Sequence, residues 1–246
     1  MDRFVDEALV LSTVDYGDAD RIVTFFTRDH GRLTAFAAGA RKSKRRFAGA
    51  LEAGTWLKAS LVSRGAGQET CRVDKVDVVK SFHRLRDDLP LIARALYCLE
   101  LCRELTRDGQ PHVELFEALK DYLALLDERK AGPTSLLKFE LDALQYTGFM
   151  PRFSPCALCH GPTGPQPRFD AQHGGVVCFA CSPRVPHGVF VPPAVVEALA
   201  GLQAGARVPL APELRARARE LLNVFIAHHL GRQLKSVAFM EQVGLD

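Results

Sequence analysis

Between residues 7 and 80, short apolar runs alternate with polar, glycine-containing segments, a pattern that favours β-strands. Arg28–Gly31 is typical of a hairpin turn, because Gly31 can take the positive φ that such turns require. We predict five strands, at Ala8–Val14, Arg21–Thr27, Arg32–Ala37, Thr55–Val62 and Thr70–Lys80. Five strands in about 75 residues match the size of a small closed barrel such as the OB-fold, and a small sandwich fits the pattern almost as well.

The apolar period changes to that of an amphipathic helix across Leu91–Leu105. Asp87 and Asp88 can cap the N-terminus of this helix, and Pro90 suits its first turn. Further helices are predicted at about Val113–Glu128, Ser135–Tyr146, Ala194–Gln203, Pro212–His229 and Leu234–Val243.

The fold class that follows is α+β and multidomain. We predict that residues 1–82 form an OB-fold β-barrel, which is the nucleic-acid-binding domain. An α-helical domain follows at residues 83–246. A Pro- and Gly-rich insert at 151–192 interrupts the helical domain and carries a four-cysteine zinc finger.

The insert holds two Cys-x-x-Cys motifs separated by 18 residues. Four thiolates suit the tetrahedral geometry and the soft-ligand preference of Zn²⁺, and the gap is typical of such sites. Because the insert is poor in apolar residues, we expect the metal, and not a hydrophobic core, to stabilise it. Four thiolates leave no open coordination position, so the sequence predicts one structural zinc ion per chain. The predicted ligands are Cys156, Cys159, Cys178 and Cys181.

Two alternatives to this zinc site stay open. The Cys-x-x-Cys pairs could be unrelated or could form a redox site. In addition, His112 and Glu114, followed by Pro155–Cys159, match the H-x-E…P-C-x-x-C signature of zinc nucleobase deaminases. A deaminase would leave Cys178 and Cys181 without a role, and the helical stretches between the two motifs provide no strands for its sheet.

Charge is unevenly distributed along the chain, although the formal net charge is only +3. Residues 21–80 carry 13 Lys and Arg against 5 acidic residues, and the excess centres on Arg41–Arg46. Five cations in six residues can lie along a phosphate backbone and displace counterions, although a charge run is often only a solvated loop. Phe36, Phe47 and Trp56 lie close by in sequence and could stack on bases, or could fill the barrel core.

Several function classes find no support in the sequence. No apolar run approaches the ~20 residues of a membrane helix, and the acidic N-terminus lacks the layout of a secretory signal, so we expect a cytoplasmic protein. The phosphate-binding loop, the paired histidines of metalloproteases and the nucleophile elbow are absent from the sequence. We therefore predict no enzymatic activity, no membrane contact and no small-molecule substrate.

Four segments of the barrel region, together with the order of the predicted parts, resemble the RecO family of bacterial recombination mediators. The segments are Glu7–Leu11, Tyr16–Val23, His30–Leu33 and the basic stretch Gly39–Phe47. The resemblance covers nearly the whole chain: barrel, helices, cysteine insert and terminal helices. It implies a protein of the nucleoid that binds single- and double-stranded DNA and anneals complementary strands without nucleotide hydrolysis.

The resemblance also implies partners and site residues. It implies that the protein acts with RecR to help RecA displace single-strand-binding protein in a RecFOR-type pathway. It also implies that the C-terminal tail of single-strand-binding protein docks on the helical domain, where the candidate contacts are Arg94, Arg103 and Lys138. By position, the DNA-binding residues are Arg21, Arg32, Arg41, Lys42, Lys44, Arg45 and Arg46. The alternative function is a zinc-ribbon adaptor for nucleic acid or protein outside recombination.

Overall fold

The computed structural model describes residues 2–43, 46–47, 49–63 and 70–244. The chain forms two compact units, which we call the barrel unit (Met1–Lys130) and the cysteine unit (Ala131–Asp246). None of the described helices is both long enough and apolar enough to cross a membrane.

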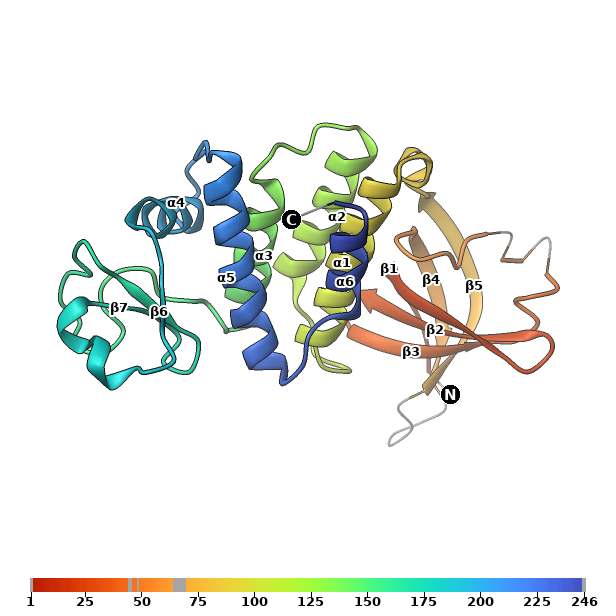
Figure 1. Ribbon diagram of the computed structural model, residues 1–246. Coiled ribbons are helices and arrows are strands. Elements are labelled where there is room, and N and C mark those ends of the chain that lie inside the picture. The colour runs from red at the N-terminus through yellow and green to blue at the C-terminus, as the bar shows by residue number, and fades with distance from the viewer. Residues whose placement is uncertain (1, 44–45, 48, 64–69, 245–246) are drawn as a thin grey trace. The chain divides into compact units, whose positions relative to one another are not determined.

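Five strands form a closed N-terminal barrel (Figure 1). The strands are β1 (Arg3–Tyr16), β2 (Asp20–Thr27), β3 (Gly31–Ala37), β4 (Trp56–Val62) and β5 (Thr70–Lys80). Their order around the barrel is β1-β2-β3-β5-β4; all neighbouring pairs are antiparallel except β3 and β5, whose parallel contact closes the barrel. This is the order of an OB-fold, so the barrel prediction is confirmed and the sandwich alternative is wrong.

Alternating side chains of the strands fill the barrel interior. Val10, Val23, Phe25, Ala35 and Leu57 are fully buried, as the period of two along each strand requires. A β-bulge in β1 between Val10 and Ser12 shifts the register and increases the local bend. The bulge reverses which positions of β1 face inward, so Val14 and Tyr16 face outward although they continue the even-numbered series of Ala8 and Val10.

Two α-helices and one short 3-10 helix complete the described part of the barrel unit. The short helix η1 (His83–Asp87) leads into α1 (Leu89–Leu105), and α2 (Val113–Asp127) follows. Phe116 of α2 packs edge-on against Phe26 of β2, with ring centroids 5.8 Å apart. The predicted capping of α1 is wrong in its chemistry: Asp88 is the N-cap residue but makes no side-chain cap hydrogen bond, and its carboxylate pairs with Arg129 instead, 3.1 Å away.

The described part of the cysteine unit combines four α-helices and one short 3-10 helix with a small sheet. Its elements are α3 (Ser135–Tyr146), β6 (Arg168–Asp170), β7 (Gly175–Val177), η2 (Phe179–Arg184), β8 (Val189–Phe190), α4 (Pro193–Gln203), α5 (Pro212–Leu230) and α6 (Lys235–Gln242). A buried ion pair joins Arg219 of α5 to Glu140 of α3. Removing one partner of such a pair would leave an uncompensated charge in the interior, which is strongly destabilising.

The expectation that the insert lacks an apolar core is wrong. Phe153, Phe169 and Val176 of the insert are buried, and the Phe169 ring meets that of Phe225 on α5 at 5.7 Å. The sequence pattern hides this core because its members are scattered singly among turns. The insert therefore has two sources of stability, apolar packing on α5 and the cysteine cluster.

Gly31, at the tip of the β2–β3 hairpin, has the predicted positive φ of 72° and also meets the α1–α2 loop. A Cβ at this position would overlap the carbonyl oxygen of Gln110, far inside contact distance. Gly39 has a nearly equal φ of 70°, and a Cβ there would meet no atom of the described residues within 4 Å, its own chain neighbours aside. The two glycines thus share a backbone conformation and differ in their surroundings.

We predict that Gly31→Ala destabilises the protein more than Gly39→Ala does. Gly39→Ala should lower the free energy of unfolding by about 1–2 kcal/mol, the cost of a left-handed alanine. Gly31→Ala should cost about 1–3 kcal/mol more, because the α1–α2 loop must move away from the new methyl group. Urea unfolding of the two variants measures the difference, and equal losses would show that the loop does not contact the hairpin this closely.

Candidate metal centre and nucleic-acid interface

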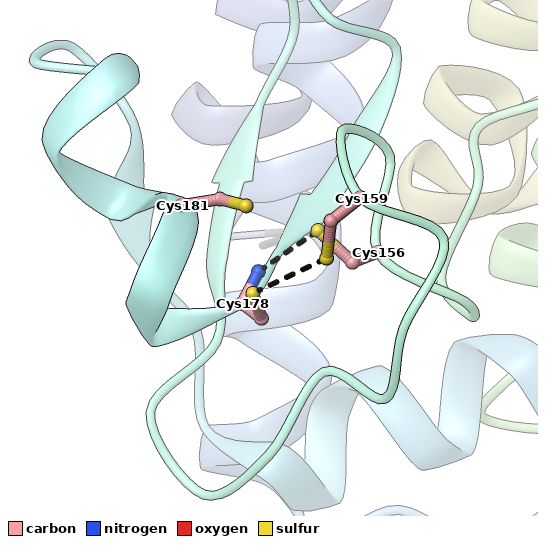
Figure 2. Close-up of side chains that lie close together, drawn as sticks. All are labelled: Cys156, Cys159, Cys178 and Cys181. Atoms are coloured by element: carbon pink, nitrogen blue, oxygen red, sulfur yellow. Dashed lines mark hydrogen bonds between the residues drawn. The ribbon is translucent and has the colours of Figure 1, made fainter.

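The four predicted cysteine ligands converge in the cysteine unit. All four Sγ atoms lie within 4.8 Å of one another (Figure 2). Cys156, Cys178 and Cys181 are buried and Cys159 is exposed, so the cluster lies at the edge of the insert.

Backbone turns hold each pair of cysteines in position. In the first turn, the backbone N–H of Cys156 donates to the carbonyl of Gly161 at 2.9 Å, and that of His160 donates to the carbonyl of Cys156 at 3.1 Å. In the second, the N–H of Cys181 donates to the carbonyl of Cys178 at 3.1 Å. The sheet joins the two turns, because β7 ends directly before Cys178 and Ala157 donates to the carbonyl of Val176 at 2.8 Å.

The thiols of the cluster differ in acidity. Burial opposes ionisation of Cys156, but backbone N–H donors from Cys159, Cys178 and Leu158 outweigh it and lower the pKa of Cys156 to about 6. Burial raises the pKa of Cys181 to about 12, and hydrogen bonding with Cys159 and Cys178 contributes in the same direction. Ligation by a cation would reverse this penalty, since a coordinating thiol is deprotonated outright.

The cluster fits a tetrahedral metal ion. Metal–sulfur bonds of about 2.3 Å place the sulfur atoms of a tetrahedron about 3.8 Å apart. The Sγ atoms of Cys159 and Cys178 are 3.7 Å apart, which agrees with this spacing. Two histidines of the insert, His160 and His173, are not part of the four-cysteine cluster. Their rings form hydrogen bonds with Arg152 and Asp170 respectively.

The basic loop of residues 41–46 is anchored to the barrel at both ends. At its start, the guanidinium of Arg41 donates to the carbonyl of Gly17 at 2.8 Å, and its backbone N–H donates to the carbonyl of Ala19 at 2.9 Å. At its end, the guanidinium of Arg46 donates to the carbonyls of Val73 and Asp74 at 2.6–2.9 Å. Arg41 is therefore attached to the β1–β2 turn, and Arg46 to β5.

These anchors leave much of the positive charge uncompensated. Carbonyl groups are neutral, so Arg46 keeps its full charge after donating to them, and it lies exposed with its guanidinium carbon 4.8 Å from the centre of the Phe47 ring. Lys42 is exposed and forms no ion pair within the part of the chain that the structure describes. Lys44 and Arg45 lie outside the described residues.

The other predicted DNA contacts are paired with carboxylates. Arg21 forms ion pairs with Asp15 at 3.1 Å and with Glu52 at 3.5 Å. Asp15 also forms an ion pair with Arg41 at 3.3 Å, so Arg21 and Arg41 share this carboxylate.

Arg32 lies at the hairpin end of β3, away from the basic loop. Its guanidinium bonds to Asp108 at 2.6 Å and to the carbonyl of Arg103. Only 23% of its side chain is exposed. Arg32 therefore holds the α1–α2 loop on the barrel, a role that its spacing in the sequence did not predict.

The three aromatic residues that the sequence places close to the basic loop have different surroundings in the structure. Phe47 is buried in the barrel core, which excludes it as an exposed stacking surface. Trp56 is half-buried and lies under the Nζ of Lys120 of α2, 5.1 Å from the ring centre. Phe36 is half-buried on the outer face, where it meets Tyr16, an aromatic that the sequence reading did not select.

The fold and the site together define a class: an OB-type barrel joined to a helical region with a four-thiol metal-binding cluster. Two family models match the chain, Recombination protein O N terminal over residues 1–82 and Recombination protein O C terminal over residues 86–238. The chain belongs to the RecO family of DNA repair proteins. The division into domains at 82/83 stays a prediction, because the compact barrel unit also includes α1 and α2.

Relatives from several bacteria are similar to the chain over nearly its full length. The DNA repair protein RecO of Myxococcus xanthus is 62% identical over 100% of both chains. That of Anaeromyxobacter sp. strain K is 47% identical, over 99% of this chain and 98% of the relative. That of Geobacter sulfurreducens is 37% identical, over 96% and 97% respectively.

We predict that Cys178→Ser removes a bound metal ion and destabilises the cysteine unit. Serine retains the size of the side chain but supplies a poor ligand, so the remaining three thiols lose affinity for the ion. Elemental analysis of the purified protein and thermal unfolding measure the two effects. Cys71→Ala, in the barrel core, is the control and should keep the metal content unchanged; equal metal contents in both variants would contradict the assignment of the ligands.

Proposed function

We propose that this chain is a non-enzymatic mediator of recombinational DNA repair that binds single- and double-stranded DNA and anneals complementary strands. The observation that carries the proposal is the basic loop, anchored at both ends on a closed OB-type barrel while Arg46 and Lys42 keep their charge. Membership of the RecO family supports it.

Annealing without nucleotide hydrolysis has two physical requirements. Cations must screen the repulsion between two polyanions, and the grip must let bases search for their register. Phosphate contacts meet both requirements, because they neutralise charge and carry no sequence information. We therefore propose that Arg41, Lys42, Lys44, Arg45 and Arg46 contact phosphates. Arg21 and Arg32 are paired with carboxylates and expose only 27% and 23% of their side chains, against 40% for Arg41, so for these two we propose a supporting contribution at most.

We further propose that the four cysteines hold one structural Zn²⁺ ion per chain. A complete set of four thiolates gives the ion no open position for substrate, so its contribution is the folding of the insert. The deaminase alternative finds no support in the cluster, since His112 and Glu114 lie on or next to α2 in the barrel unit and four sulfur atoms already form a full ligand set.

The proposed partners follow from the family. We propose that the chain acts with RecR to help RecA displace single-strand-binding protein at gaps, in the cytoplasm at the nucleoid, and that it receives that protein's C-terminal tail. Of the candidate contacts for the tail, Arg103 is paired with Glu104 at 3.1 Å and Lys138 with Asp142. Arg94 is half-buried on α1.

We predict that replacing the five cations of the basic loop by alanine slows annealing and reduces the salt dependence of DNA binding. If all five meet phosphates of a single strand, the slope of log K against log[salt] should become less steep by about 3.5. Fluorescence anisotropy of a labelled oligonucleotide at several salt concentrations measures the slope, and a complementary-strand assay measures annealing.

The control for this prediction is Arg129→Ala combined with Lys130→Ala. Both are exposed cations of the same unit, paired with Asp88 and Glu128 and located away from the loop in sequence. This control should leave binding and slope close to those of the unmodified protein. An unchanged slope in the folded five-alanine variant would rule out the loop as the contact surface.

A further inference from the structure

An apolar row crosses the outer face of the barrel, where polar residues are expected. Strand register aligns Val14 of β1, Ile22 of β2, Phe36 of β3 and Arg72 of β5 as successive neighbours. The next row, Val23, Ala35 and Cys71, points into the core and is buried. The first row must therefore point outward, and Val14 is 63% exposed.

Tyr16 adds a second ring to this row. It lies two residues after Val14 on the same face of β1 and is 55% exposed. Its ring meets that of Phe36 edge-on, with centroids 5.9 Å apart and an interplanar angle of 84°. Two aromatic rings on an open barrel face, with Val14 and Ile22 beside them, form a surface that flat apolar groups can cover.

Arg41 and Arg46, at the two ends of the basic loop, attach to backbone carbonyls next to this row. Arg41 donates to the carbonyl of Gly17, the residue that follows Tyr16. Arg46 donates to the carbonyl of Val73, the residue that follows Arg72. Cations thus flank an aromatic surface, the combination with which OB-folds bind a single strand: phosphates on the cations and bases on the rings.

The acidic residues near this surface are only partly compensated. Asp15 is paired with Arg21 and Arg41, whereas Asp20 accepts a hydrogen bond from the neutral backbone N–H of Gly39 at 2.7 Å and keeps its charge. Asp18 is exposed at the tip of the β1–β2 turn. Among the described residues, no carboxylate lies within ion-pair distance of Arg72 or Lys42.

We propose that Tyr16 and Phe36 form a base-stacking platform that gives the barrel a preference for single-stranded over double-stranded DNA. The inference rests on the proposed function and adds to it the selective element. Bases of a duplex are already stacked inside the helix, so only an unpaired strand can place them on these rings. The basic loop, in contrast, contacts phosphates and serves both forms of DNA.

The test compares oligothymidylate with a duplex of equal length, using Tyr16→Leu combined with Phe36→Leu. Leucine keeps apolar volume but removes both rings, so affinity for oligothymidylate should fall by about 5- to 150-fold for each stacked base that is lost. Affinity for the duplex should change by less than about 2-fold, and the salt slope should be unchanged, because the phosphate contacts remain. Tyr146→Leu, which removes a partly exposed ring on α3, is the matched control and should bind both DNAs normally.

A second measurement does not depend on a substitution. Oligothymidylate that carries iododeoxyuridine should crosslink on irradiation to Tyr16 or Phe36 of the full-length protein. Unchanged single-strand affinity, an equal loss for both DNAs, or crosslinks located only elsewhere would overturn the platform while leaving the loop as the contact surface. If the unmodified protein binds neither DNA at low salt, the proposed function itself fails, and the two failures are thereby distinguished.

Discussion

A parallel contact of three residue pairs between β3 and β5 is the constraint on which the barrel unit depends. It joins Thr34, Ala35 and Phe36 to residues 70–72 and turns a meander of strands into a closed barrel. Closure removes the exposed edges that an open sheet of this size would present. It also places β5 beside β3, and so brings the carbonyls that receive Arg46 next to the outer row that contains Phe36.

The elements of this fold were largely readable from the sequence, and their long-range contacts were not. Ser135–Tyr146 is predicted with the observed bounds, and Thr70–Lys80 likewise, because local periodicity and flanking Gly and Pro define such segments. Closure and the bulge depend on pairing between distant strands. The predicted strand ends at Val14, whereas β1 extends to Tyr16. Without the bulge, simple alternation from Val10 would place both residues inside the barrel, so periodicity alone does not identify their exposed face.

The metal cluster could be predicted from local sequence, whereas the cations available to DNA could not. Cysteine spacing alone specified the thiol cluster, because both turns are local and four soft ligands have few other uses. The cations of the barrel looked equivalent as a sequence, yet their partners differ. Arg32 is held by an aspartate 76 residues away, whereas Arg46 is held by backbone carbonyls. Only contacts between distant residues decide which cation remains available to a phosphate.

The division of labour between rings and cations bears on how a strand can be both held and released. Ion contacts with phosphates weaken as salt rises and act at any register, whereas stacking is lost when a base pairs. A strand held by both is therefore gripped most firmly while it is unpaired. If Tyr16 and Phe36 stack bases as proposed, pairing with the complement removes those bases from the rings and leaves only the phosphate contacts. The annealed product then loses the stacking contribution, which favours its release without nucleotide hydrolysis.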